Sequence, residues 1–352
     1  MPDVLAYQVP DDGTAPADAS PGALGRAARF ALTAAREAVA DAGLDAHEVA
    51  EAAVVIGTAV GESGGARAAT TATGDGTPAP AAGSWEPMFS VARPRGAELA
   101  TFGPNISVSN ACAASGYALS VAVDLIRRGE ADTVLLGGAE GIARVPLASF
   151  SRLGAADPET CRPFDAGRRG TVFGEGAAVL VLQSARAAAG RPVYGRVLGT
   201  AWSCDAHHPT APDPGGEQLV RVARAALEEA GRGPGDIGCV PHGTGTRQND
   251  VVEYQVLREV LGDRAAHTPL FSLKAFIGHT AGAAAAFAAV SAALMVRHGE
   301  IPANIALARQ DPECPVWLPQ DGPTALRQPN VLVNAYAFGG SNFTMVFGGG
   351  SR

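Results

Sequence analysis

The stretch "AREAVADAGLDAHEV" at residues 35–49 has a near copy, "ARAALEEAGRGPGDI", at residues 223–237. Each copy is typical of a helix that ends at an Ala-Gly pair and is followed by a polar turn. A β-branched strand and a loop rich in Gly and Thr come next in both places, as "VVIGTAVG" and "CVPHGTGT". Because the two copies lie about half a chain length apart, the sequence indicates two copies of one α/β unit.

A second pair of helices supports this duplication. The helix expected after Cys112 ends in "LIRRGEAD", and the helix expected after His279 ends in "LMVRHGEIP". Ala-rich helices resemble one another by composition alone, but the matched order of elements favours duplication. We therefore expect an N-terminal unit at residues 1–185 and a C-terminal unit at residues 186–352.

The N-terminal unit has the pattern of strands alternating with helices. The expected elements, in chain order, are a strand at 3–9, a helix at 24–42, a strand at 52–61, a loop at 62–86, a strand at 105–110, a helix at 111–128 and a strand at 132–140. This spacing predicts a parallel βαβ arrangement.

Composition excludes several classes of protein. The 352 residues are 47% hydrophobic and 18% charged, which predicts a large buried core. The net charge of −8 argues against a general nucleic-acid binder. No apolar run of membrane-spanning length and no signal peptide is evident, so we expect a cytoplasmic protein that binds neither nucleic acid nor membrane.

The five cysteines predict neither disulfides nor a metal site. They are odd in number, widely spaced and without a CxxC pair. The pair His207-His208 has no nearby acidic or thiol cluster, so no metal is expected. Lys274 is the only lysine among 27 basic residues, which indicates either chance placement on the surface or a site that needs a compact ammonium.

Cys112 lies in "SVSNACAASGYAL", residues 107–119. It is open to three interpretations: a core thiol, a metal ligand or a nucleophile. Its place where a strand gives way to a helix N-terminus favours a thiolate. The small residues that follow allow backbone and substrate to approach closely.

Two of the seven histidines stand in a setting suited to catalysis. His242 follows an apolar strand in "VPHGTGTRQND", and His279 begins a helix in "IGHTAGAAAAF". The remaining five are interpreted as structural. Near the C-terminus, Phe338, Gly339 and Gly340 interrupt a β-rich run, either as an oxyanion hole or as an ordinary hairpin turn. Together these groups suit acyl transfer onto sulfur.

Five motifs together resemble the β-ketoacyl synthases, condensing enzymes of the thiolase superfamily. They are, in the family's order, "NACAAS", "CRPFDAGRRGTVFGEGAAVLVL", "HGTGTRQND", "KAFIGHTAG" and "NAYAFGGSN". The resemblance extends over about residues 24–348. It implies an α/β, thiolase-like fold, a duplicated αβαβα five-layer architecture with two pseudo-symmetric halves, and a dimer.

The resemblance also implies a set of roles. Cys112 would take an acyl group from the phosphopantetheine arm of an acyl carrier protein or from coenzyme A, with no bound cofactor. His242 and His279 would promote decarboxylation of a malonyl thioester, with Lys274 supporting the His279 side. The N–H groups of Cys112 and Phe338 would form the oxyanion hole, and Phe338 with Gly339 and Gly340 a gate. Substrate-binding positions would be Thr244, Thr246 and Asn342.

The predicted activity is decarboxylative Claisen condensation in bacterial polyketide or related secondary metabolism. Acyl transfer or cyclisation through the same acyl-Cys112 is the alternative, and a non-catalytic chain-length-factor-type partner is a third. The enzyme would be a homodimer or a heterodimer with a ketosynthase-like partner. A carrier protein could dock on basic residues, for which the candidates are Arg127, Arg128, Arg168 and Arg169.

The chain departs from the family pattern at a few positions. Few residues precede the first family-like helix, which indicates a trimmed N-terminal half. Ala285 and Ala288 stand where relatives often have Gly and a Glu of the lysine network. Tyr336 and Ala337 stand where Phe and Gly are common, and Ala337 predicts a stiffer gate.

Overall fold

The structure, a computed structural model, describes residues 5–10, 24–61, 91–92, 99–235 and 237–349. The loop expected at 62–86 lies outside the described residues. Helix α1 (Arg26–Ala42) and the short strand β1 (Ala6–Tyr7) fall within the ranges predicted for them. Gly43 ends α1 in a left-handed conformation, with φ +60°, as the Ala-Gly stop predicts.

The first sheet has the strand order β3-β2-β4-β6. Its members are β2 (Ala53–Gly57), β3 (Asn105–Val108), β4 (Thr133–Glu140) and β6 (Gly176–Gln183). Strand β2 is parallel to both β3 and β4, whereas β6 is antiparallel to β4. The predicted parallel arrangement is confirmed, with β2 inserted between the two strands that the helix joins.

The second sheet has the order β7-β12-β11-β8. Its members are β7 (Arg196–Cys204), β8 (Gly238–Val240), β11 (Asn330–Tyr336) and β12 (Ser341–Gly348). Strands β8, β11 and β12 repeat the order and directions of β2, β4 and β6. A parallel bridge from Cys239 to Leu270 places residue 270 where β3 lies in the first sheet. The duplicated design is confirmed, while the boundary at residues 185/186 stays a prediction.

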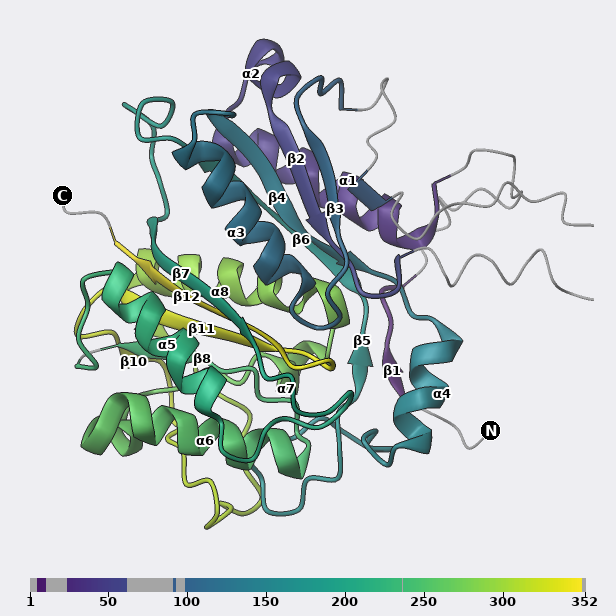
Figure 1. Cartoon of the computed structure of the whole chain (residues 1–352), viewed down its shortest axis with the longest axis vertical. Coiled ribbons are helices and arrows are strands. Elements are labelled where there is room, and N and C mark those ends of the chain that lie inside the picture. Colours follow the sequence, from purple (N-terminus) through teal and green to yellow (C-terminus); the bar gives the residue numbers. More distant parts are fainter. Residues whose placement is uncertain (1–4, 11–23, 62–90, 93–98, 236, 350–352) are drawn as a thin grey trace, which may run out of the picture.

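Helices and sheets alternate in five layers (Figure 1). Helix α1 covers the outer face of the first sheet, and α5 (Glu217–Glu229) with α6 (Arg247–Leu261) covers that of the second. Helices α3 (Ala114–Arg127) and α8 (Ala284–His298) pack against each other between the sheets. One hydrophobic cluster fills this middle layer and two smaller clusters fill the outer interfaces. The predicted thiolase-like αβαβα architecture is confirmed.

The remaining elements are short and connect or flank these layers. They are α2 (Ala46–Glu51), α4 (Arg144–Arg152), α7 (Lys274–Ile277), the 3₁₀ turns η3 (Gly262–His267) and η4 (Ala281–Ala283), and strands β5 (Phe173–Gly174), β9 (Glu300–Ile301) and β10 (Thr324–Ala325).

One helical stretch corrects the expectation that no apolar run reaches membrane-spanning length. Ala281–His298 has 18 residues and a mean hydropathy of 1.3, which is long and apolar enough by composition. However, 67% of it is buried inside the protein, because α8 packs between the two sheets. Its apolar character is explained by this central position.

Candidate active site

Cys112 lies at a tight junction between strand β3 and helix α3. Ala111 has a left-handed φ of +44°, and the helix begins two residues after the cysteine. A Cβ on Gly57 would come within 2.3 Å of the Ser115 backbone nitrogen, so only glycine fits beside this helix start. The Ser115 hydroxyl accepts a hydrogen bond from the Ala286 N–H at 3.0 Å. The small residues after Cys112 therefore let β2, α3 and α8 meet, as predicted.

The Cys112 thiol is protonated at neutral pH. Burial raises its pKa to about 11 and the charge of Glu140 adds to this, whereas Lys274 and the backbone N–H groups of Phe338 and Cys112 lower it. The backbone N–H groups favour the thiolate, as expected, but burial outweighs their effect on the pKa of the thiol. The N–H groups of Phe338 and Cys112 both lower the pKa of the thiol, and the oxyanion hole that they would form stays a prediction.

His242 and His279 face each other as neutral imidazoles. Their ring centroids are 5.6 Å apart and their planes are nearly perpendicular, at 86°. Both side chains are buried, with residue exposures of 3% and 1%. Burial, with the nearby charge of Lys274, holds the pKa of each well below its usual value. Each ring therefore carries one N–H donor and one acceptor at neutral pH.

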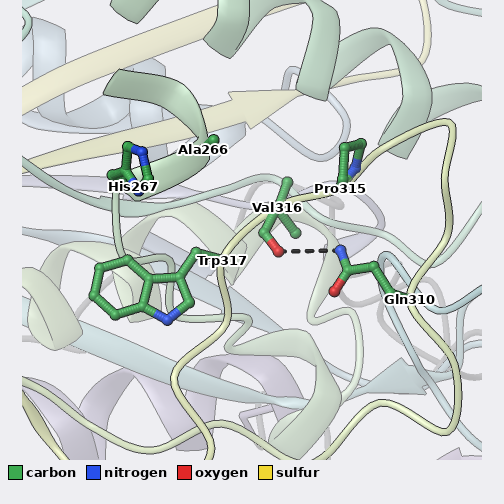
Figure 2. Close-up of a pocket in the computed structure, with 6 residues that line it drawn as sticks. All are labelled: Ala266, His267, Gln310, Pro315, Val316 and Trp317. Carbon is green, nitrogen blue, oxygen red and sulfur yellow. Dashed lines mark hydrogen bonds between the residues drawn. The ribbon is translucent and has the colours of Figure 1, made fainter. Parts of the chain in front are cut away.

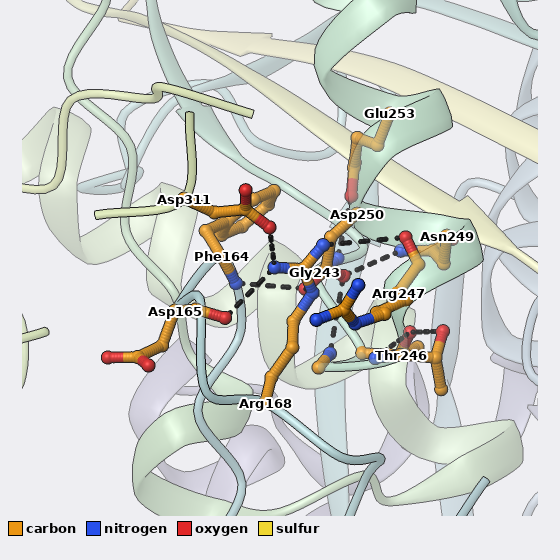
Figure 3. A network of polar contacts seen from close by, with 12 residues as sticks. Phe164, Asp165, Arg168, Gly243, Thr246, Arg247, Asn249, Asp250, Glu253 and Asp311 are labelled. Carbon is orange, nitrogen blue, oxygen red and sulfur yellow. Dashed lines mark hydrogen bonds and ion pairs between the residues drawn. The ribbon is translucent and has the colours of Figure 1, made fainter. Parts of the chain in front are cut away.

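Glu253 on α6 holds the backbone that carries His242. Its two carboxylate oxygens accept the N–H groups of His242 and Gly243, each at 2.7 Å (the carboxylate is seen at the top of Figure 3). Burial raises its pKa to about 7, against the opposing effects of these hydrogen bonds and of Lys274. Glu253 was not among the site residues predicted from the sequence. The sequence does hold a sign that Glu253 is buried. It is an acidic residue three positions after Asp250, on the face of α6 that also carries buried Val256 and Leu257.

A short parallel contact with strand β5 holds His279. Its N–H donates to the Val172 carbonyl at 2.7 Å, and its carbonyl accepts the Gly174 N–H at 3.1 Å. The Phe173 ring stacks on the imidazole with a centroid distance of 5.9 Å. The motif at residues 161–182 therefore positions His279, through two backbone hydrogen bonds and the stacked ring of Phe173.

Lys274 is buried beside His242, so its contacts extend beyond the His279 side that the resemblance implies. Its ammonium donates to the His242 carbonyl, and its charge acts on His242, His279 and Cys112. Burial lowers its own pKa, and the charge of Glu253 is the largest effect that opposes this. Glu253 thus supplies a negative charge to the lysine although Ala288 stands where the family's Glu is common.

Phe338 caps the site at the turn between β11 and β12. Its ring stacks on Phe150 of α4 at 4.7 Å, and Phe150 meets Phe173 edge-on at 4.7 Å. The N–H groups of Gly339 and Gly340 donate to the carbonyls of Pro209 and Ala337. Among these three residues, it is therefore Phe338 whose N–H acts on the thiol. Both glycines have a left-handed φ, which Ala337 does not need in this state.

The three predicted substrate-binding residues have intramolecular partners. The hydroxyls of Thr244 and Thr246 lie 2.9 Å apart, in the loop that follows His242. The Asn342 amide donates to Asp205 Oδ1 at 2.7 Å and to Ser203 Oγ at 3.2 Å. Their substrate contacts stay predictions.

Arg168 is wrong as a docking residue, because its side chain is fully buried. It forms ion pairs with Asp250, at 3.1 Å, and with Asp311 (Figure 3). Arg127, Arg128 and Arg169 have exposed side chains, and each makes an ion pair. Their partners are Glu229, Glu130, and Asp157 with Glu159, respectively.

A pocket of about 430 Å³ lies elsewhere, between η3 and the segment 310–317 (Figure 2). Its lining contains none of the predicted site residues; it consists of Ala266, His267, Gln310, Pro315, Val316 and Trp317. Within the part of the chain that the structure describes, no cluster of three or more His, Cys, Asp or Glu residues could hold a metal ion.

Comparison with known proteins gives consistent matches. Residues 13–188 match the model "Beta-ketoacyl synthase, N-terminal domain", and residues 194–308 match "Beta-ketoacyl synthase, C-terminal domain". The 3-oxoacyl-[acyl-carrier-protein] synthase 2 of Staphylococcus aureus is 34% identical over 336 residues, covering 92% of this chain and 83% of that protein. Nodulation protein E of Rhizobium meliloti is 34% identical over 249 residues, covering 70% and 62%.

Solved structures give the same result. The ishigamide ketosynthase/chain length factor matches with a TM-score of 0.87 and 35% identity, covering 98% of this chain and 88% of that one. A type II PKS acyl-carrier protein in complex with its ketosynthase, bound to the hexaketide, matches with a TM-score of 0.84 and 26% identity. That match covers 93% of this chain and 85% of the other.

Proposed function

The chain belongs to the β-ketoacyl synthase family, and we propose that Cys112, His242 and His279 perform the condensation that defines this family. It is an acyltransferase-type condensing enzyme. One observation supports this assignment most strongly. The charge of Lys274 influences the pKa of all three groups, the Cys112 thiol and the imidazoles of His242 and His279. A nucleophile, two neutral N–H donors and an N–H pair at the sulfur therefore share one buried place.

The first step is transfer of an acyl group. Cys112 Sγ attacks the carbonyl carbon of an acyl thioester, the carbon–sulfur bond to the carrier breaks, and the thiol proton leaves with the carrier's sulfur. The oxyanion of the tetrahedral intermediate accepts hydrogen bonds from the N–H groups of Cys112 and Phe338. Because the thiol is protonated at rest, attack and proton loss have to be coupled.

The second step is decarboxylative condensation. A malonyl thioester loses CO₂, and the electron pair of the broken bond forms an enolate. Its oxygen accepts the N–H groups of His242 and His279, which neutral imidazoles donate without giving up the proton. The enolate carbon then attacks the acyl-Cys112 carbonyl, the bond to sulfur breaks, and the released thiolate takes up a proton.

We assign an acyl carrier protein as donor of both thioesters, with no resident cofactor. A structural relative is described as an acyl-carrier protein in complex with its ketosynthase, and the S. aureus relative is named for this carrier. Arg127, Arg128 and Arg169 are the exposed candidates for its docking. Bacterial polyketide or related secondary metabolism is the proposed pathway class, in the cytoplasm.

We further propose that the enzyme works as a dimer. Two of the matching structures are ketosynthases with a chain length factor, which supports either a second copy or a ketosynthase-like partner. Sedimentation of the purified chain distinguishes them, since a chain that stays monomeric at micromolar concentration requires the separate partner.

The assignment is tested by intact-mass analysis. The protein is incubated with acyl-carrier protein and then with malonyl-carrier protein. An acyl adduct that Cys112→Ala lacks, and that is consumed with release of CO₂ and formation of a β-keto product, is the expected result. His242→Ala should still form the adduct. An adduct that malonyl-carrier protein leaves untouched would instead support the acyl-transfer or cyclisation alternative, which the relatives do not favour.

A further inference from the structure

Tyr336 brings a buried hydroxyl next to His242. It is the last residue of β11, and its ring centroid lies 5.6 Å from that of His242, with planes tilted by 50°. The side chain is buried, at 6% exposure. Its hydroxyl has no hydrogen-bond partner among the described residues.

The ring of His242 also has a buried polar atom that lacks a hydrogen-bond partner in the described part of the chain. Its Nδ1 is also buried and, within the described chain, also without a hydrogen-bond partner. An unpaired buried donor or acceptor loses its hydrogen bonds to water without replacement, so two such atoms on adjacent rings are unfavourable if they stay unpaired. A buried water that joins two such groups removes both costs, and buried waters are regular parts of protein structures.

The two atoms have complementary roles. Burial, with the nearby charge of Glu253, holds the pKa of the Tyr336 hydroxyl well above its usual value, so it keeps its proton and can donate. Burial holds the pKa of His242 well below its usual value, so one ring nitrogen is free to accept. A donor and an acceptor, each buried and unpaired among the described residues, therefore lie on rings whose centroids are 5.6 Å apart.

We propose that Tyr336 is a positioning residue for His242, and that its hydroxyl donates through one buried water to His242 Nδ1. The hydrogen bond at one imidazole nitrogen decides which tautomer forms. An accepting Nδ1 puts the proton on Nε2, and Nε2–H is then the donor available to the thioester oxygen. This inference rests on the proposed function, because it assigns His242 the role of hydrogen-bond donor to the enolate.

The test compares Tyr336→Phe with wild-type protein and with Tyr194→Phe. The control removes a surface hydroxyl that donates to Asp41, far along the chain from the site. In ¹⁵N-histidine-labelled protein, with His242→Ala used to assign the signal, wild type should show the Nε2–H tautomer of His242. Tyr336→Phe should show a mixture, and Tyr194→Phe should match wild type.

Partial reactions give a second readout. Loss of one hydrogen bond of ordinary strength predicts that malonyl decarboxylation falls about tenfold in Tyr336→Phe, while acylation of Cys112 stays within about twofold. The melting temperature should not rise, whereas removal of a truly unpaired buried hydroxyl would raise it.

An unchanged tautomer with an unchanged decarboxylation rate, or a raised melting temperature, would overturn the role of Tyr336. If wild type itself neither forms an acyl adduct nor decarboxylates malonyl-carrier protein, the proposed function fails instead. The two failures are therefore distinguishable.

Discussion

At the scale of single residues, burial dominates the chemistry of the site. Cys112, His242, His279 and Lys274 all lie in it, and burial shifts the pKa of each toward its uncharged form. The uncharged imidazoles of His242 and His279 suit the reaction, since a neutral imidazole donates to an enolate without quenching it. The charge that remains in the site is the ammonium of Lys274, and the carboxylates of Glu253 and Asp250 favour this charged form.

The alkylation of Cys112 should follow its raised pKa. Below a pKa of about 11, the thiolate fraction grows tenfold per pH unit, so the rate with iodoacetamide should rise about tenfold per unit from about pH 7 to pH 9.5. Intact mass of a Cys204→Ser background follows the modification, with Cys112→Ser as the blank. A plateau below pH 9 would show a thiol far more acidic than its burial predicts.

Two variants that each remove one charge should change the alkylation rate of Cys112 in opposite directions. Lys274 lowers the pKa of Cys112 and Glu140 raises it, so at one fixed pH Lys274→Met should slow alkylation and Glu140→Gln should speed it. Removal of a nearby charge predicts about a tenfold change. General loosening of the fold would speed both, so a change of equal sign in the two variants would contradict an electrostatic cause.

At the scale of elements, the β11–β12 turn positions Phe338 through two glycines that differ in their surroundings. Gly339 has a φ of +85°, and a Cβ there would meet no atom within 4 Å. Gly340 has a φ of +76°, and a Cβ there would lie 2.9 Å from the Asp205 Cβ. Only Gly340 therefore combines backbone strain with a contact to the loop after β7.

This difference makes Gly339→Ala a matched control for Gly340→Ala. Each should lose about 1–2 kcal/mol of unfolding free energy from the left-handed conformation alone. Gly340→Ala should also push the turn away from Asp205 and displace the Phe338 N–H, which we expect to cut condensation at least about tenfold. Urea unfolding and turnover measure the two effects. Equal turnover in both variants would show that the contact with Asp205 does not position the turn.

The sequence predicted what depends on local pattern. Cys112, His242 and His279 could be proposed as site residues because each follows or begins an element within small, flexible residues. Glu253 was missed because an acid on a helix usually faces solvent, and only the fold brings both its oxygens onto the N–H groups of residues 242 and 243. Arg168 was misassigned for the same reason, since arginines are mostly exposed unless paired.

At the scale of the whole molecule, the candidate site draws its proposed residues from both halves of the duplicated fold. The N-terminal half contributes Cys112 at the start of α3, and the C-terminal half contributes both histidines and Lys274. Helices α3 and α8 pack back to back between the sheets, which brings the two helix starts together (Figure 1). Because no half carries the complete set, we expect the reaction to depend on contacts that join distant segments.

The Arg168 network is one such contact. Its guanidinium pairs with Asp250 at the start of α6 and with Asp311, and it donates to the Asp165 carbonyl at 2.9 Å (Figure 3). Asp250 in turn accepts the N–H groups of Phe164 and Gly245, so the network joins residues 162–168 to the loop that carries His242. Asp250 and Arg168 side chains are fully buried, so neither charge is solvated.

Removal of the Arg168 side chain should therefore lower the unfolding free energy far more than removal of the neighbouring Arg169 side chain. Arg168→Met leaves two carboxylates without their cation and should cost about 3–5 kcal/mol of unfolding free energy, the usual penalty for breaking a buried ion pair. Arg169 is half-exposed and pairs with Asp157 and Glu159 at the surface, so Arg169→Met should leave the urea midpoint almost unchanged. Similar midpoints for the two variants would mean that water reaches the Asp250 and Asp311 carboxylates, and that the loop bearing His242 is held by Glu253 rather than by this network.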